Sequence, residues 1–344
     1  MKYEFLNLNK HNLNELNNLY NTIFKRNRSQ KIAEWEFLSN PIRHKLNYVI
    51  KDNDNIIGHW GIIPHHLIIN SKEFKGGKIE NSMIRDSFRG KGIYKDFEIF
   101  TSNQAIKSGL IIWSVSTPSA IGLRTKIGYQ LVGYFKSYEI VLLSFNIKAF
   151  LYLFKYLFDE LISPKLAIKN FYKRLLLCRD FIDTTKFCKT NIESVLNILD
   201  LIKKYNYNTI KRSREYFNWR FGLNPIMNYK YIIHKETNSY AIYTIKGDSA
   251  IIHDFGRVKN GIFDMLNDSE LQSLFIYFRK SGFLRIKIKS IQNSILSKYL
   301  KEQGFFISRK HSMLNQGALV IKGLENNLDL DNWFFTNIYS EGIN

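Results

Sequence analysis

A sequence pattern that occurs twice is the feature that most limits what this chain can fold into. Trp35-Glu36-Phe37-Leu38-Ser39-Asn40-Pro41 returns as Trp219-Arg220-Phe221-Gly222-Leu223-Asn224-Pro225, so both copies read W-x-F-x-x-N-P. Only 5 of the 344 residues are tryptophan and only 5 are proline, so a chance recurrence is hard to accept. A strand-like apolar run follows each copy. The pattern therefore predicts two copies of one folding unit.

Two shorter matches keep the same order along the chain. Lys107-Ser108-Gly109-Leu110 matches Lys280-Ser281-Gly282-Phe283, and Gly128-Tyr129 matches Gly304-Phe305. The spacing drifts slightly, as expected when the loops of a duplicated domain change length. At 344 residues the chain is long enough for two domains that each bury a core. We expect an N-terminal lobe over 1–144, linker helices over 145–180 and a C-terminal lobe over 181–344.

The first copy reads as an α/β arrangement with a mixed sheet (α+β). The expected elements are a strand over 3–8, a helix over 12–24, a short helix around Trp35, strands over 46–51, 56–69 and 78–85, a helix over 94–108, a strand over 110–115, a helix over 120–126 and a strand over 132–143. Turn signals at 52–55 and at Gly76-Gly77 predict an antiparallel meander. The later helix, ended by Gly109, and the apolar strand after it predict a β-α-β crossover.

One loop between a predicted strand and a predicted helix carries the chemistry. It reads Arg89-Gly90-Lys91-Gly92-Ile93-Tyr94. Glycines let the backbone approach a ligand, and the free N–H groups of a first helical turn favour an anion. Arg89 and Lys91 add positive charge, so the loop predicts a pyrophosphate site.

With this loop, the sequence resembles the GNAT superfamily of N-acyltransferases, whose loop reads R/Q-x-x-G-x-G/A and holds the pyrophosphate of acyl-coenzyme A. Arg89, Gly92 and Ile93 fall on that pattern. Thr117-Pro118-Ser119 looks like the segment after the family's fifth strand, and Lys126-Ile127-Gly128-Tyr129 like the end of the next helix. The resemblance implies two tandem GNAT-like lobes, with motifs only in the first.

The resemblance also implies a donor and its binding residues. Acyl-CoA, either acetyl-CoA or a short hydroxyacyl-CoA, would be the donor, and no metal is implied. Splayed strands would expose backbone N–H groups that hold the pantetheine arm and the carbonyl oxygen. The residues implied at the coenzyme are Met83, Ile84, Arg85, Arg89, Gly90, Lys91, Gly92, Ile93, Tyr94, Thr117 and Ser119.

An amine that attacks a thioester must lose a proton, so the site needs a base. Glu80 lies on the strand that enters the loop and could act directly or through water if burial raised its pKa. His66 is the second candidate, because imidazole titrates near neutral pH and one of His65 and His66 must face inward. For the acceptor we expect four residues that could instead be core: Trp60, Asn81, Tyr134 and His253.

Two positions and one segment depart from the family pattern. Tyr94 stands where the family favours Gly or Ala. Arg124 stands where many members place a tyrosine that protonates the leaving thiolate. The corresponding segment of the second copy, 255–262, lacks the closely spaced glycine pair. The second lobe is therefore expected to be degenerate and to bind no coenzyme A.

The net charge of +20 suits polyanionic substrates. Glu80-Asn81-Ser82-Met83, followed by the loop, is similar to a tandem-lobe branch that acylates nucleotide-linked amino sugars. We expect an N-acyltransferase acting on a dTDP- or UDP-linked amino sugar for surface polysaccharide such as lipopolysaccharide or capsule, by direct attack in a ternary complex. The alternatives are an aminoacyl-tRNA-dependent aminoacyltransferase of peptidoglycan precursors and a non-catalytic basic binding module. For the amino-sugar N-acyltransferase, no nucleic acid partner is expected.

The cellular setting follows from what the termini and cysteines lack. The first residues carry no apolar export signal, and Cys178 and Cys188 cannot form a disulfide framework. We therefore expect a cytoplasmic protein. The apolar stretch Phe145 to Ile162 is broken by charges, so it predicts an amphipathic linker helix or a weak membrane-surface contact instead of a membrane span.

Overall fold

The structure is a computed structural model. It describes residues 3–42, 46–142, 151–152, 186–308, 317–324 and 329–337. The linker helices expected over 145–180 lie outside the described residues, except for 151 and 152, and Cys178 lies outside them as well.

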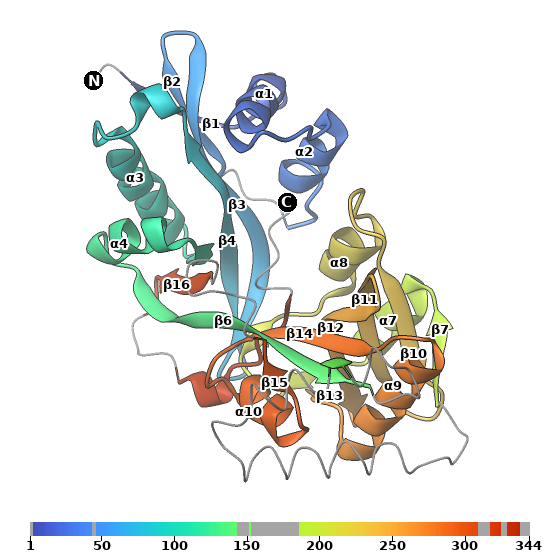
Figure 1. Cartoon of the computed structure of the whole chain (residues 1–344). Helices are drawn as coiled ribbons and strands as arrows, with labels where there is room; N and C mark the ends of the chain where they lie inside the picture. The colour runs from blue at the N-terminus through green and yellow to red at the C-terminus, as the bar shows by residue number, and fades with distance from the viewer. Residues whose placement is uncertain are drawn as a thin grey trace.

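The first half follows the predicted order of elements. These are β1 (Glu4–Asn7), α1 (Leu13–Phe24), α2 (Gln30–Phe37), β2 (Tyr48–Asp52), β3 (Asn55–Ile69), β4 (Lys72–Ile84), a 3-10 turn (Asp86–Phe88), α3 (Ile93–Lys107), β5 (Ile111–Ser116), α4 (Pro118–Lys126) and β6 (Gln130–Val141) (Figure 1). The expected mixed α/β fold is confirmed, and most bounds agree within two residues.

One turn was predicted in the wrong place. The β3–β4 hairpin turns at Asn70 and Ser71, which both have positive φ, and β4 already begins at Lys72. Gly76 and Gly77 lie inside β4. A Cβ at Gly77 would stand 2.3 Å from the Ile62 side chain, so these glycines serve close packing and not a turn.

The second half repeats the same kinds of element. These are β7 (Phe187–Thr190), α7 (Ile192–Leu199), β8 (Lys204–Tyr205), β9 (Thr209–Ile210), α8 (Arg214–Phe217), a π-helical turn (Asn218–Gly222), β10 (Lys230–His234), β11 (Ser239–Lys246), β12 (Ser249–Lys259), β13 (Ile262–Asp264), α9 (Asp268–Lys280), β14 (Arg285–Ile291), α10 (Ile295–Glu302), β15 (Phe306–Ile307), β16 (Ala318–Lys322) and a 3-10 turn (Leu330–Asn332).

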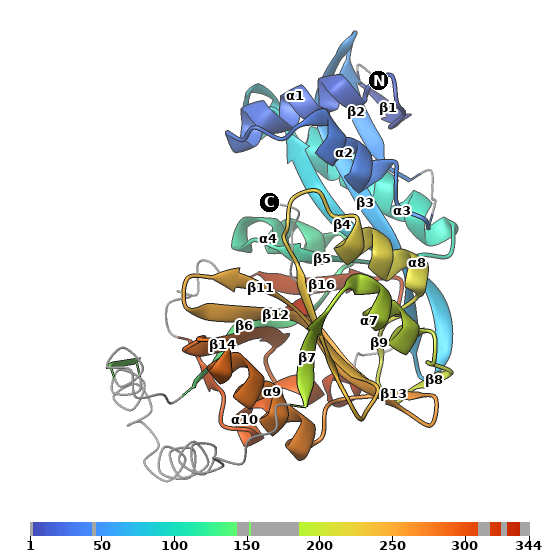
Figure 2. The same ribbon diagram turned by 90° about the vertical axis from the view of Figure 1, so that its right-hand side faces the viewer.

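The strand order of the sheet repeats between the two halves. The first half has the order β1-β2-β3-β4-β5-β16-β6, and the second has β7-β10-β11-β12-β14-β6-β15. In each series the fourth and fifth strands are parallel (β4 with β5, β12 with β14). The other neighbours in each series are antiparallel. In Figure 2 most of the first series lies in the upper part of the molecule and most of the second in the lower part.

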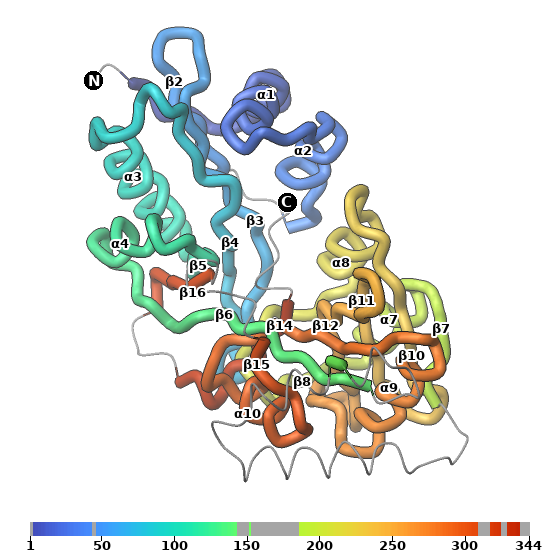
Figure 3. The backbone as a smooth tube through the Cα atoms, viewed as in Figure 1, coloured from blue at the N-terminus to red at the C-terminus, as the bar shows by residue number. Residues whose placement is uncertain are grey.

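Each half of the chain contributes one strand to the sheet of the other half. β16, near the end of the chain, lies between β5 and β6. β6, from the first half, continues into the second sheet, where residues 135–141 pair with β14 and residues 138–139 also pair with β15. The crossing of β6 from one half to the other can be followed along the tube in Figure 3. The strands therefore exchange reciprocally.

Helices cover both faces of the first sheet (Figure 1). Phe97 of α3 packs in a core cluster with Ile62 and Ile79 on one face. Leu16 of α1 packs with Met83 on the other face, in a cluster that also includes residues of α2. Burial on both faces explains why β3 reads as an almost continuous apolar run.

The two copies of the W-x-F-x-x-N-P pattern meet at their tryptophans. The rings of Trp35 and Trp219 stack with centroids 4.8 Å apart and planes 19° apart. Trp35 Nε1 donates to the carbonyl of Trp219 at 3.1 Å, and Trp219 Nε1 donates to the carbonyl of Trp35 at 3.0 Å. The Asn-Pro ends also agree, since Asn40 and Asn224 each accept a hydrogen bond from the N–H two residues later. The pattern is therefore a contact between the halves.

We expect the two tryptophans to be energetically coupled. Trp35→Phe and Trp219→Phe should each lower the free energy of unfolding by about 1 kcal/mol through the lost hydrogen bond. Because the two indoles bond each other's carbonyls, a double-mutant cycle from urea unfolding should give a coupling of roughly 0.5–3 kcal/mol. Trp333→Phe is the control, because Trp333 is equally buried but stacks on Phe335. Its pairing with Trp35→Phe should be additive within about 0.5 kcal/mol. Additivity of the Trp35 and Trp219 changes would contradict the coupling.

Candidate active site

The predicted phosphate loop is open and uncapped. Gly90 and Gly92 adopt left-handed backbone conformations with φ of 75° and 79°, and a Cβ at either would meet no atom within 4 Å. Gly92 precedes α3, whose first turn has no side-chain cap. The first N–H groups of α3 therefore face outward with the positive end of the helix dipole behind them. Such a cradle suits a pyrophosphate.

The charged and aromatic residues of the loop differ in what they can offer. Arg89 is exposed and pairs with Asp86 at 2.9 Å, and the Lys91 ammonium lies 5.1 Å from the Phe88 ring. The Tyr94 hydroxyl is buried, and burial raises the pKa of that phenol. Tyr94 can therefore offer the loop its backbone N–H, whereas its side chain fills the interior.

Strands β4 and β5 part next to this loop. They pair only from Gly76 to Lys78, although β4 continues to Ile84. The Arg85 N–H donates to the carbonyl of Ile57 on β3. Contrary to the expectation, this N–H is therefore not available to the coenzyme. Because successive backbone groups alternate between the two edges of a strand, the N–H of Ile84 faces the opening. The opening offers main-chain donors to an extended ligand arm.

A β-bulge interrupts β4 within the stretch that no longer pairs with β5. The pairing register of β3 with β4 shifts between His59 and Gly61, so Trp60 on β3 faces two residues, Asn81 and Ser82, on β4. Asn81 has a φ of 51°. This value lies in the left-handed region of backbone conformation, which residues other than glycine rarely adopt.

The bulge places two consecutive polar side chains on one face of β4. Ile79 packs with α3, so Glu80 points to the opposite face, where α2 lies. Asn81 points to this face too, because its amide donates to the Glu36 carboxylate. The Glu80 carboxylate forms an ion pair with Lys78 and is largely buried. Burial lowers the pKa of Lys78, and Glu80 opposes that change.

A chain of buried polar groups connects α1 and α2 to the bulge. Arg28 Nη1 donates to Glu36 at 2.8 Å, and Arg28 Nε donates to Asn17 at 2.7 Å. The Arg28 guanidinium lies 3.7 Å from the centre of the Tyr20 ring. Burial raises the pKa of Glu36 to about 8, although Arg28 opposes the change. Glu36 thus links the N-terminal helices to Asn81.

Arg124 bridges the far side of the opening. Its Nε donates to Glu98 of α3 at 2.7 Å, and its Nη1 donates to Ser114 and Ser116 of β5 at 2.6 and 2.7 Å. Its Nη2 reaches Ser82 of β4 at 3.3 Å. The guanidinium therefore joins α3, α4, β4 and β5 at the level of the bulge.

Three residues expected to bind the acceptor are buried or occupied. Trp60 is fully buried in the core, and Asn81 uses its amide on Glu36. His253 is 2% exposed, its Nε2 hydrogen-bonds Thr244 at 2.7 Å, and burial lowers its pKa to about 3. These three side chains are buried, which agrees with the alternative that they belong to the interior. Tyr134 on β6 is 41% exposed and stays a prediction.

His66 lies away from the bulge. Its Nδ1 pairs with Glu73 at 2.7 Å, and its backbone faces Lys75 near the hairpin turn. Gly61, which faces Glu80, is five residues back along β3, or roughly 16 Å at 3.3 Å per residue. The structure therefore does not bring His66 and Glu80 together. The inward-facing histidine is His65, which accepts a hydrogen bond from Trp113.

Thr117 and Ser119 lie where β5 gives way to α4, with their hydroxyls 3.0 Å apart and exposed. Together with the loop they flank the opening of β4 and β5. The backbone of Met83 and Ile84 and the loop residues are thus brought to one region. The contribution of Thr117 and Ser119 to coenzyme binding stays a prediction.

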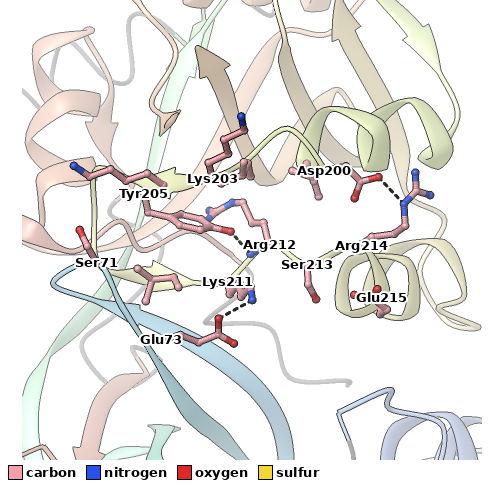
Figure 4. Close-up of a pocket in the computed structure, with 14 residues that line it drawn as sticks. Ser71, Glu73, Asp200, Lys203, Tyr205, Lys211, Arg212, Ser213, Arg214 and Glu215 are labelled. Atoms are coloured by element: carbon pink, nitrogen blue, oxygen red, sulfur yellow. Dashed lines mark hydrogen bonds and ion pairs between the residues drawn. The ribbon is translucent and has the colours of Figure 1, made fainter. Parts of the chain in front are cut away.

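A cavity of about 520 Å³ lies elsewhere, where the β3–β4 hairpin meets the second half (Figure 4). Lys211 pairs with Glu73 at 2.6 Å across it, and the Tyr205 hydroxyl accepts the Arg212 N–H at 2.8 Å. Its lining contains none of the residues expected at the coenzyme or the acceptor.

Sequence analysis did not identify the buried carboxylates that hold the site residues in place. Glu36 lies between Trp35 and Phe37 on a helix, and Glu98 lies on the buried side of α3. A charged residue at a buried helical position needs a partner, and that was the available signal.

Within the described residues, no helix is long and apolar enough to cross a membrane, and no cluster of His, Cys, Asp or Glu could hold a metal ion.

Comparison with known proteins agrees with this geometry. Residues 4–132 match the family model described as Acetyltransferase (GNAT) domain. No curated protein matches the sequence. The family match supports GNAT-type N-acyltransferase activity with an acyl-CoA donor.

Solved structures resemble nearly the whole chain. A GCN5-related N-acetyltransferase from Anabaena variabilis ATCC 29413 has a TM-score of 0.60 at 15% identity, covering 93% of this chain and 72% of that one. One from Kribbella flavida has a TM-score of 0.61 at 9% identity, covering 93% and 70%. A conserved protein of unknown function from Enterococcus faecalis V583 reaches 0.63 at 10% identity, covering 93% and 72%. At these identities the likeness shows the fold alone.

The buried His253 predicts a specific loss of stability in acid. Burial lowers its folded pKa to about 3, whereas the unfolded histidine titrates near 6.5. Between these values only the unfolded state takes up the proton, so stability falls as the pH falls from about 6.5 to about 3. His253→Gln should reduce the slope of unfolding free energy by up to about 1.4 kcal/mol per pH unit in that window. His11→Gln, at an exposed site, should leave the slope unchanged. Equal slopes for His253→Gln and wild type would contradict the lowered pKa.

Proposed function

Since residues 4–132 match a GNAT acetyltransferase domain, we propose that this chain transfers an acyl group from acyl-CoA to the amino group of a nucleotide-linked amino sugar. The observation that carries the proposal is the uncapped start of α3 behind two left-handed glycines, next to the opening of β4 and β5. Acetyl-CoA or a short hydroxyacyl-CoA would be the donor, and surface polysaccharide synthesis would use the product.

The donor side follows from the main chain. Gly90, Gly92 and the first N–H groups of α3 would hold the pyrophosphate, with Arg89 and Lys91 close by. The N–H of Ile84 would hold the arm in the opening. Bound acyl-CoA supplies the activated carbonyl carbon that an amine attacks.

The acceptor side follows from Glu80. Its carboxylate lies beside the bulge on the face of β4 toward α2, and Lys78 holds it in place. A carboxylate there could take a proton from the acceptor ammonium directly or through a water, so that the neutral amine attacks the thioester carbonyl. The net charge of +20 favours an acceptor that carries phosphates.

We also propose that the chain consists of two GNAT-like lobes, over 1–144 and 181–344. The repeated strand order and the paired tryptophans support this division. Gly109 and Gly282 end α3 and α9 with φ of 77° and 82°, which supports a common origin. The second lobe would contribute to the acceptor site and not to coenzyme binding.

A thermal-shift panel tests the proposal. Acetyl-CoA and hydroxyacyl-CoA thioesters are crossed with dTDP- and UDP-linked amino sugars, because a ligand of the folded state raises the melting temperature. Shifts with an acyl-CoA and with one amino sugar, followed by CoA release when both are present, would support it. Binding of tRNA alone would favour an aminoacyl-tRNA-dependent enzyme. Binding of none of these would favour a non-catalytic module.

Gly92→Asp should abolish coenzyme binding without unfolding the protein. Asp tolerates a left-handed backbone and suits the start of a helix, but its carboxylate would repel the pyrophosphate. We expect the Kd for acetyl-CoA to rise at least tenfold, or about 1.4 kcal/mol, by calorimetry. Gly109→Asp is a matched control, because Gly109 has a φ of 77° and equally open surroundings at the other end of α3. Unchanged binding by Gly92→Asp would remove the loop from the mechanism.

Glu80→Gln should lower turnover while leaving acetyl-CoA bound. Loss of a general base typically costs about 10²–10⁴ in rate, so we expect kcat/KM to fall in that range. The measurement is CoA release with the best acceptor of the panel. Glu73→Gln, a carboxylate near the other end of β4, should retain full activity. Full activity of Glu80→Gln would exclude Glu80 as the base.

A further inference from the structure

We propose that Glu36 is a positioning residue of the acyl-transfer site, which holds Asn81 in its left-handed conformation and so fixes the bulge of β4. The inference rests on the proposed function for its catalytic meaning. Glu36 would touch neither donor nor acceptor. It would act through Asn81 on the place of Glu80 and on the free edge of β4.

Asn81 is held at two points. Its side-chain amide donates to the Glu36 carboxylate, and its carbonyl accepts a hydrogen bond from His59 Nδ1 at 3.0 Å. A carbonyl can only accept, so His59 carries its proton on Nδ1. Burial lowers the pKa of His59 to about 3, which keeps the ring neutral. Glu36 and His59 are both fully buried, so water does not compete for either hydrogen bond to Asn81.

Glu36 is itself fixed. Arg28 donates to its second oxygen at 2.8 Å, and Arg28 is in turn held by Asn17 and lies over the Tyr20 ring. The anchor thus passes from α1 through α2 to β4. A left-handed conformation is unfavourable for most residues with a Cβ, and two buried hydrogen bonds to Asn81 offset that cost.

The bulge decides which side chains point where. Ile79 and Ile84 both pack with α3, although five positions along a regular strand would put them on opposite faces. The extra residue corrects this parity. It also leaves Glu80 next to Asn81 on the α2 face and turns Ser82 toward Arg124. Without the bulge, either Glu80 or the edge that includes Ile84 would face the wrong way.

The second half shows that the left-handed residue is not required by the fold. β11 and β12 also shift register, between Ile242 and Tyr243, with His253 at the irregularity. No residue of β12 has a positive φ. The position equivalent to Glu36 in the repeated pattern is Arg220. The carboxylate anchor and the left-handed asparagine therefore occur together, in the half that has the phosphate loop.

The test uses variants of the full-length chain at both partners. Asn81→Ala removes the anchor and keeps the Glu36–Arg28 pair, so it should fold. Asn81→Gly removes the anchor too, but glycine adopts the left-handed region freely. Glu36→Gln keeps a hydrogen-bond acceptor for Asn81, and Glu36→Ala does not. Residue 81 is followed by its ¹³C chemical shifts or by crystallography, and acetyl-CoA affinity by calorimetry.

We expect residue 81 to leave the left-handed region in Asn81→Ala and in Glu36→Ala, with acetyl-CoA binding weakened at least tenfold. Asn81→Gly, Glu36→Gln and the double variant Glu36→Ala/Asn81→Gly should keep the bulge and bind within about threefold of wild type. A left-handed residue 81 in Asn81→Ala, or no rescue by glycine, would overturn the proposal. If the wild type binds no acetyl-CoA, the proposed function fails, and the backbone measurement still decides the role of Glu36.

Discussion

Together with the exchange of β6 and β16, the reciprocal contact of Trp35 with Trp219 joins the two halves. Each indole stacks on the other and donates to the other's carbonyl, so neither can move without breaking both bonds. The contact joins α2 to the π-helical turn of the second half. α2 also carries Glu36, one residue away, so the helix that joins the halves is the helix that reaches the bulge. Assembly of the molecule and geometry of the site share one element.

The site itself has a solvent-exposed side and a buried side. The loop and the edge of β4 offer main-chain donors to solvent, whereas the carboxylates behind them are buried and paired. Buried charges cost free energy unless they are hydrogen-bonded. Glu36, Glu80 and Glu98 each have a cationic partner. The pairs hold side chains in fixed places around a region that must accept two substrates.

Much of this could be predicted from the sequence because it depends on local pattern. Apolar periodicity gave the helices and strands of the first half, and the glycine pair between a strand and a helix predicted the loop that the structure presents. Non-local facts could not be predicted this way. Gly76 and Gly77 read as a turn, but packing of Ile62 against β4 placed them in a strand. Trp60 and His253 were expected either at the acceptor site or in the core, and tertiary packing places both in the interior. The register shift at Asn81 depends on partners far away in sequence.

The exchange of β6 and β16 has a consequence for biosynthesis on the ribosome. The first sheet needs β16 between β5 and β6, and β16 is residues 318–322 of 344. The N-terminal half can therefore close its sheet only after residues 318–322 have been translated. Until then β5 exposes an unpaired edge, which is a hazard for aggregation in nascent chains. Folding of the first half would thus wait for a strand that lies about 180 residues beyond β6 in the sequence.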